Sequence, residues 1–200
     1  MAIPTIKVVL GGTPGKLVRF SYLTVHTPRQ DRFSKVPKLQ YSCTFLIPKT
    51  NVEDVKLVKA VVAECLKVTF TDKKKPIPPG HWNPLRDGDK DTKEDGRPYG
   101  DEAKGHYLIN SKTSEDYPPS VVSTTKGADG KLLRIGKAEI KSGDWGRAEL
   151  ALYGYADKAG GVGAGLNKVQ MVQEGEALSG GTSADEAFGR FEDEEEGGVL

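Results

Sequence analysis

The stretch LQYSCTFLIPKTNVEDVKLVKAVVAECLKV, residues 39–68, changes its hydrophobic period at Pro48. Before the proline, apolar and polar residues alternate over 39–47, which is the pattern of a half-buried β-strand. After it, Asn51 stands where a helix N-cap belongs, two acids follow, and valines recur at helical spacing. The stretch therefore predicts a strand that Pro48 closes and a helix over about 52–67.

Segments rich in β-branched and aromatic residues flank this strand–helix pair on both sides. They are expected as strands at 5–10, 16–26, 105–112, 119–124, 131–140, 144–156 and 166–173. The GGVGAG run before the last segment is interpreted as a hairpin turn, because glycine runs favour turns. Six to eight strands with one helix after the third predict a mainly-β fold. An OB-fold, a five-stranded Greek-key barrel with one helix and here with extra strands and loops, fits this order.

Residues 72–100 interrupt the strand pattern, since 13 of these 29 residues are charged and nine are Gly or Pro. We expect a long surface loop, inserted into a single domain that spans residues 1–181. Asp87, Asp89 and Asp91 match the first positions of a calcium-binding EF-hand loop, but the later positions do not match. We therefore expect no metal and no cofactor, although a weak cation site stays open. Catalytic motifs are also missing, so a metal-dependent nuclease that uses these aspartates ranks below two non-enzymatic hypotheses.

The charge of the chain is unevenly distributed. Residues 182–200 hold seven acids and one base, a net charge of −6, so that the total of +1 leaves +7 on residues 1–181. A block of like charges repels itself and buries little apolar surface, which predicts a disordered acidic tail. The basic body attracts polyanions, and the tail imitates one. The tail residues expected to regulate binding are Glu192, Asp193, Glu194, Glu195, Glu196 and Leu200.

Aromatic and basic side chains alternate in two segments, 16–41 and 144–156. In the second segment the aromatic and basic residues lie on one face of the expected strand, and small or aliphatic residues lie on the other face. If exposed, such a face suits stacking of unpaired bases, but the alternative that it forms the core stays open. The basic loop over 26–38 lies where an OB-fold holds nucleic acid, and an ordinary solvated loop is its alternative. The residues expected to bind DNA are Arg19, Tyr22, Arg29, Arg32, Phe33, Lys38, Trp82, Trp145, Arg147, Tyr153, Tyr155 and Lys168.

Four segments, in this order, resemble a family of bacteriophage single-stranded-DNA-binding proteins first catalogued as a domain of unknown function. They are NPLRDGD (83–89), GHYLINSKT (105–113), SGDWGRAELALYGY (142–155) and GVGAGLNKVQMVQEGEALSGG (161–181), with FLIPK (45–49) before the helix. Gly160 and Gly161 depart from the expected Gly-Asn, which affects a turn. The resemblance implies an OB-fold core, sequence-tolerant binding of unpaired DNA, a role in phage DNA replication, recombination or repair, and an acidic C-terminal tail.

The residues and the resemblance together predict a single-stranded-DNA-binding protein. Its tail is expected to compete with DNA and to recruit replication or recombination proteins. The alternative is a structural β-sandwich protein of a virion or scaffold, in which the tail serves solubility. Apolar runs are too short for a membrane span and the N-terminus lacks the features of a secretory signal. We therefore expect the protein in the cytoplasm of the infected bacterial host, without a membrane partner, and a homodimer stays open.

Overall fold

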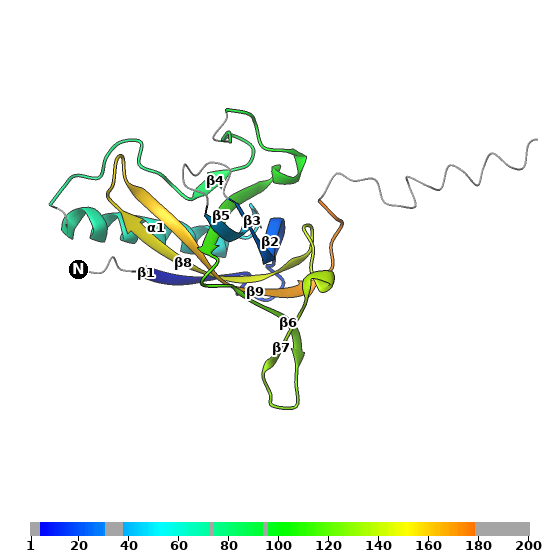
Figure 1. Cartoon of the computed structure of the whole chain (residues 1–200). Helices are drawn as coiled ribbons and strands as arrows, with labels where there is room; N and C mark the ends of the chain where they lie inside the picture. Colours follow the sequence, from blue (N-terminus) through cyan, green and yellow to red (C-terminus); the bar gives the residue numbers. More distant parts are fainter. Residues whose placement is uncertain (1–4, 31–37, 73, 94–95, 179–200) are drawn as a thin grey trace, which may run out of the picture.

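The computed structural model describes residues 5–30, 38–72, 74–93 and 96–178 (Figure 1). Its strands are β1 (Thr5–Leu10), β2 (Val18–Gln30), β3 (Leu39–Pro48), β4 (Leu85–Asp87), β5 (His106–Ser114), β6 (Ser120–Lys126), β7 (Leu132–Arg134), β8 (Trp145–Tyr155) and β9 (Gly161–Gln173). The helix α1 spans Val52–Asp72, and two short 3-10 helices span Asp101–Ala103 and Lys137–Glu139. The predicted mainly-β fold with its α-helix after the third strand is confirmed.

Five strands pair in a closed ring, in the order β8–β2–β3–β5–β9 and back to β8. Four of these pairings are antiparallel, and the β5–β9 pairing is parallel. The ring has the strand number of the expected OB-fold. Among the described strands β1 pairs only with β8, so it lies outside the ring, and α1 follows the second of the five ring strands. All strands belong to one connected sheet, unlike the two stacked sheets of the alternative β-sandwich.

The core fills the ring and the space between α1 and the long β8–β9 hairpin. Phe20 and Phe45 are fully buried, and their rings meet edge to face with centroids 5.8 Å apart. The predicted apolar stripe of α1 packs into this same core. Asn51 caps the helix by accepting the backbone N–H of Asp54 at 3.3 Å. The Asp54 carboxylate in turn accepts the N–H of Gly11 at 2.6 Å, which fixes the helix start to the turn after β1.

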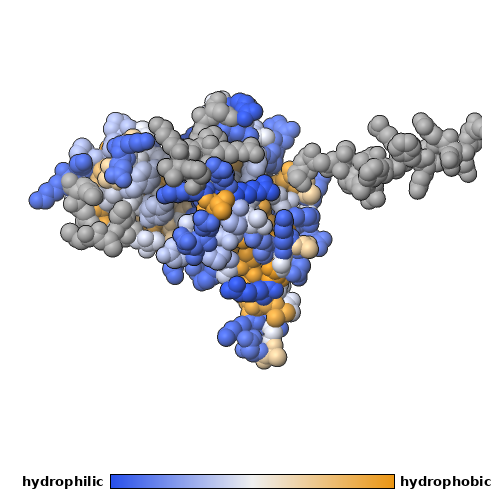
Figure 2. Space-filling view, viewed as in Figure 1, coloured by the Kyte–Doolittle hydropathy of each residue, from blue (hydrophilic) through white to orange (hydrophobic). Residues whose placement is uncertain are grey.

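The β6–β7 hairpin projects from the body of the molecule (Figure 1). Figure 2 shows apolar residues gathered on this hairpin and at its base. Leu132 and Leu133 of β7 are 39% and 45% exposed. Neither α1 nor the short helices of the described chain are long and apolar enough to cross a membrane.

One prediction about a turn is wrong. The GGVGAG run does not form a turn, because β9 begins at Gly161 and continues through the run. A Cβ on Gly163 would lie 2.5 Å from the ring of Tyr153, and one on Gly161 would lie 2.5 Å from the carbonyl oxygen of Trp82. Glycine is therefore needed within this strand because an aromatic ring and a second backbone approach it closely.

Other predicted boundaries also shift. The second strand runs on to Gln30 and the helix to Asp72, beyond the expected 26 and 67. The strand expected over 131–140 is reduced to β7, and a 3-10 helix follows it. The loop expected over 72–100 contains β4, which pairs with β5. The acidic tail, 182–200, lies outside the described residues.

Candidate nucleic-acid interface

The two faces of β8 differ in burial. Ala148, Leu150 and Leu152 are buried in the core, whereas the parity that carries Trp145 and Tyr153 is only partly buried. Tyr153 is 40% exposed. The alternative that the aromatic parity forms the core is therefore wrong.

The ring presents a polar surface on the side of β2, β3 and β5 that is opposite to the core. In β3, Cys43 and Phe45 point into the core, so Ser42 and Thr44 point outward. In the adjacent β5, Lys112 lies beside Ser42 and Asn110 beside Thr44. The Thr24 hydroxyl of β2 is 2.9 Å from the Ser42 hydroxyl. We call this surface, formed by Thr24, Gln40, Ser42, Thr44, Asn110, Lys112 and Ser114, the polar face. The DNA-binding residues predicted from the sequence do not include these side chains.

A β-bulge in β2 exposes Tyr22 at the side of the polar face. The register with β3 shifts between Ser21 and Thr24, and the N–H of Leu23 donates to the Ser142 hydroxyl at 3.0 Å. Tyr22 has a φ of 49° and its side chain is 61% exposed. A left-handed backbone is unfavourable by roughly 1–2 kcal/mol for a residue with a Cβ, and bulges re-aim side chains. The fold therefore holds an aromatic ring in solvent at an energetic cost.

Arg19 and Trp145 lie together at one end of the same surface. They are register partners in β2 and β8, and the Arg19 Cζ lies 5.6 Å from the centroid of the Trp145 ring. The guanidinium also donates to the carbonyls of Gly143 and Glu176, at 3.0 and 2.8 Å. The cation is thereby fixed beside an indole ring, an arrangement that suits a base together with its phosphate.

Residues 174–178, which we call the strap, cross this end of the ring. The N–H of Gly175 donates to Asp144 Oδ1 at 3.0 Å, and the N–H of Leu178 donates to the Ser142 carbonyl at 3.0 Å. Burial raises the pKa of Asp144, but hydrogen bonds from Lys141 and Gly175 outweigh it, and the pKa lies below its usual value. Leu178 packs against a small cluster of Leu46, Ala103 and Leu108, on the polar-face side of β3 and β5. The chain therefore leaves the described structure next to Arg19 and Trp145.

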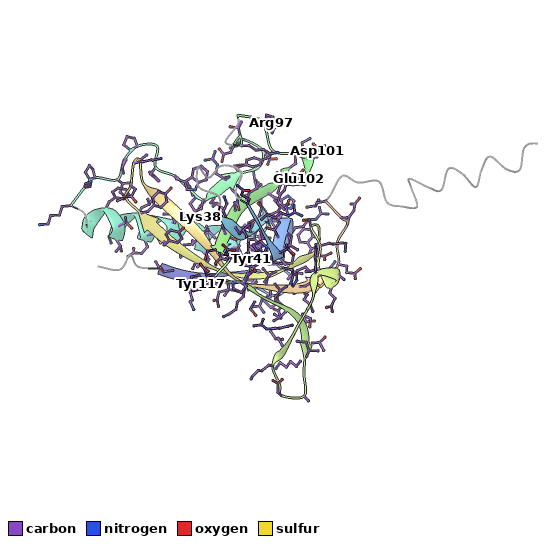
Figure 3. The ribbon with its side chains drawn as sticks, in the orientation of Figure 1. Lys38, Tyr41, Arg97, Asp101, Glu102 and Tyr117 are labelled. Atoms are coloured by element: carbon purple, nitrogen blue, oxygen red, sulfur yellow. The ribbon has the colours of Figure 1, made fainter. Side chains whose placement is uncertain are left out.

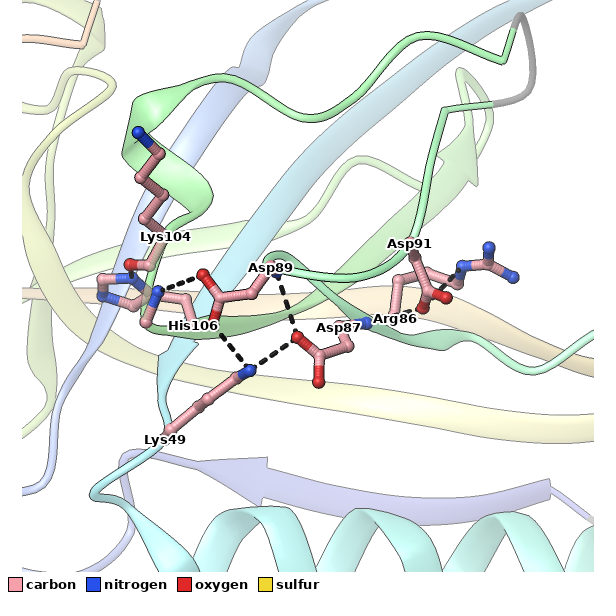
Figure 4. A network of polar contacts seen from close by, with 8 residues as sticks. Lys49, Arg86, Asp87, Asp89, Asp91, Lys104 and His106 are labelled. Carbon is pink, nitrogen blue, oxygen red and sulfur yellow. Dashed lines mark hydrogen bonds and ion pairs between the residues drawn. The ribbon is translucent and has the colours of Figure 1, made fainter.

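The aspartates of the 72–100 segment are paired with cations (Figure 4). Lys49 Nζ donates to Asp87 Oδ1 at 2.5 Å and to Asp89 Oδ2 at 2.7 Å. These hydrogen bonds lower the pKa of both carboxyls and raise the pKa of Lys49. Asp91 pairs with Arg86 Nε at 3.3 Å. Within the part of the chain that the structure describes, no three His, Cys, Asp or Glu side chains are placed to hold a metal ion.

Five of the remaining predicted residues form two further groups. One group lies at the far end of β8 and consists of Tyr153, Tyr155 and the neighbouring Trp82. Trp82 forms an isolated β-bridge with Gly161 of β9, and the Arg86 Cζ lies 5.4 Å from the centroid of the Trp82 ring. Along β8 and β9, Lys168 Nζ donates to Glu149 at 3.0 Å, and the Nε of Arg147 is buried without a hydrogen-bond partner.

At the other end of the polar face, Arg29 is exposed opposite Gln40, and Lys38 is exposed just before β3 (Figure 3). Arg32 and Phe33 lie outside the described residues, as do Glu192, Asp193, Glu194, Glu195, Glu196 and Leu200. The structure thus brings Arg19 and Trp145 to one end of the polar face and Arg29 to the other, with Tyr22 exposed in the β2 bulge between them. Tyr153 and Tyr155 lie apart from these residues, at the far end of β8.

A comparison with protein families gives a match over residues 6–199 to a family described as the single-stranded-DNA-binding protein of Enterobacter phage Enc34. The chain belongs to this family. The match confirms the resemblance noted in the sequence, and it includes the polar face, the strap and most of the acidic tail. No curated protein matches the chain significantly.

Solved structures of phage single-stranded-DNA-binding proteins share the fold. The protein from bacteriophage Enc34 in complex with single-stranded DNA is 21% identical, with a TM-score of 0.63, over 88% of this chain and 89% of that one. Its C-terminal truncation is 22% identical, with a TM-score of 0.62, over 87% and 88%. The gp2.5 protein encoded by bacteriophage T7 is 15% identical, with a TM-score of 0.53, over 98% and 99%. At these identities the likeness establishes the fold of this family member.

Proposed function

We propose that this chain binds single-stranded DNA along the polar face without sequence preference, as a non-enzymatic protein. Tyr22 and Trp145 stack on bases, and Arg19 and Arg29 neutralise phosphates. The observation that carries the proposal is the exposed Tyr22 ring, held by a strained bulge next to the polar face. Hydroxyl and amide side chains between these anchors accommodate the sugar–phosphate backbone in any sequence.

The family supports this proposal. The relative from bacteriophage Enc34 was solved in complex with single-stranded DNA, and its fold matches this chain over most of both lengths. In an OB-fold, the face of the second and third strands and the adjoining loops bind oligonucleotides. In the ring, these strands are β3 and β5, which carry most of the polar face. A role in phage DNA replication, recombination or repair in the host cytoplasm follows from binding DNA that is transiently unpaired.

The first test is the salt dependence of binding. Each phosphate neutralised on a single strand contributes about 0.7 to the slope of log affinity against log salt. Arg29→Gln should therefore lower the magnitude of that slope by about 0.7 in titrations of labelled oligo-dT. Lys67→Gln, which removes an exposed cation from α1, should leave the slope unchanged. Equal slopes for both variants would argue against a phosphate contact at Arg29.

We further propose that the acidic tail competes with DNA for the polar face. The strap, the last described segment before the tail, is bound to Arg19, and this supports a high local concentration of the −6 charge of residues 182–200 near the basic surface. Bound DNA displaces the tail. The freed acids and the terminal apolar residues then bind a basic, partly apolar site on a replication or recombination protein.

Deletion of residues 182–200 tests this competition. The truncated chain should bind oligo-dT more tightly than the full chain at low salt, and the difference should shrink as salt screens the tail. A full chain in which the five clustered acids are replaced by their amides, with the length unchanged, should behave like the truncation. An unchanged affinity in both variants would refute competition by the tail.

A further inference from the structure

The ring has a pocket of about 320 Å³ at the end of the polar face that holds Trp145. Its walls come from four parts of the chain: the segment before β2, the end of β3 with the segment that joins it to α1, the start of β8 and the end of β9. The lining residues are Gly15, Lys16, Leu17, Pro48, Thr50, Asn51, Trp145 and Gln173. The volume is at the lower end of the range for small-molecule sites.

The chemistry of the walls suits a nucleobase. The Trp145 indole offers a flat aromatic wall, while Leu17 and Pro48 add apolar surface. Lys16 lies at the exposed rim, where its Nζ contacts the Thr50 carbonyl at 3.4 Å. An ammonium group has three donors, so Lys16 can also bind a phosphate. A Cβ on Gly15 would meet nothing within 4 Å, which leaves the rim open at that point.

The polar groups within the pocket provide little base discrimination. Asn51 uses its amide nitrogen on the Lys16 carbonyl and on Asp54, and its amide oxygen on the N–H of Asp54. Both amide N–H donors of Asn51 are therefore used within the fold, and its amide oxygen already accepts one hydrogen bond. The Gln173 side chain remains as an adaptable amide that can pair with different base edges.

We propose that this pocket accepts one unpaired base of the bound strand, stacked on Trp145, with the adjoining phosphate at Lys16. The inference rests on the proposed function, because the base belongs to the strand that the polar face binds. The pocket adds a fixed position for one base at one end of the polar face, which otherwise binds DNA without sequence preference. One nucleotide of each bound stretch is then held in a defined position.

The test uses the full chain in a Trp82→Phe background, so that Trp145 is the remaining tryptophan. Thr50→Phe places a ring in the pocket, and Thr13→Phe places the same ring on the exposed turn outside it. Loss of one stacked base should weaken oligo-dT binding about 5- to 150-fold in Thr50→Phe, with loss of the Trp145 quenching that the background shows. Thr13→Phe should bind oligo-dT with the affinity of the background protein, and its Trp145 fluorescence should be quenched to the same extent.

The outcomes separate the pocket from the proposed function. If Thr50→Phe and Thr13→Phe show the same oligo-dT affinity and the same quenching of Trp145 fluorescence, the chain binds DNA but the pocket does not hold a base. If oligo-dT does not bind the background protein at all, the proposed function fails and the pocket inference fails with it. A second measurement needs no pocket variant: irradiation of the full chain with oligo-dT that carries 5-iodouracil should crosslink the peptide that contains Trp145. Crosslinks found only in other peptides would overturn the proposal.

Discussion

Replacing Tyr22 by glycine should separate DNA binding from stability. The left-handed backbone at φ 49° is unfavourable by roughly 1–2 kcal/mol for tyrosine, and glycine removes this strain. Glycine also gives the unfolded chain more conformational freedom, and this entropy lowers the free energy of unfolding by about 0.5–1 kcal/mol. The ring is 61% exposed, so its loss forfeits a minor part of the roughly 1.5–3 kcal/mol that full burial of a large side chain gives. The free energy of unfolding should therefore stay within about 1 kcal/mol of the unaltered chain.

The affinity for DNA should respond much more strongly. One base stacked on an aromatic ring contributes about 1–3 kcal/mol, so Tyr22→Gly should weaken oligo-dT binding about 5- to 150-fold. Fluorescence anisotropy of labelled oligo-dT measures the affinity, and urea unfolding followed by circular dichroism measures the stability. Tyr22→Phe keeps both the ring and the strain, and it should bind as the unaltered chain does.

Two results would refute this reasoning. Unchanged affinity in Tyr22→Gly would mean that the exposed ring does not touch DNA, and the observation that carries the proposed function would be lost. A loss of stability well beyond 2 kcal/mol would mean that Tyr22 serves the fold and that the strain at the bulge is compensated by its own contacts.

Two further predictions concern stability. Gly143→Ala should lower the free energy of unfolding by about 1–3 kcal/mol in urea titrations, because φ is 113° and the new Cβ would lie 1.9 Å from a carbonyl oxygen of the strap. Gly136→Ala, with φ at −88° and no neighbouring atom closer than 3.6 Å, should change it by less than about 0.5 kcal/mol. Lys49→Met should lower the melting temperature at pH 7, where the depressed pKa values of Asp87 and Asp89 keep both carboxylates charged and paired. The difference from the unaltered chain should shrink as the pH falls below 3.8, the ordinary pKa of these groups, and a difference independent of pH would contradict the pairing.

Local patterns in the sequence predicted the elements well where their cause was local. The strand that ends at Pro48 and the Asn51 cap depend on neighbouring residues, and both are observed. The glycine run in β9 was misassigned because its cause is distant: the Tyr153 ring and the Trp82 backbone occupy the space of the missing side chains. Local periodicity does not contain that information.

The candidate site was predicted only in part, because contacts between distant segments also determine it. Alternation along β8 identified Trp145, and alternation over residues 16–41 identified Arg19, but their pairing joins strands far apart in the chain. The polar face escaped prediction because serine, threonine and asparagine carry no charge signal. The alternation of residues 39–47 nevertheless indicated that the polar side chains of this strand point away from the core. Lys112 had the same signal in GHYLINSK, where it shares a parity with Asn110.

The closure of the ring has a consequence for how the molecule is made. The bonds from Arg19 to Gly143 and Glu176 join residues 124 and 157 positions apart, and β2 meets β8 only after most of the chain has been synthesised. Such long-range pairing is slow, and until then the nascent β2–β3 hairpin exposes an open edge. Termination of translation before residue 173 would give a chain whose final ring strand is incomplete, whereas termination just after the strap would give a complete ring without the acidic residues that follow it.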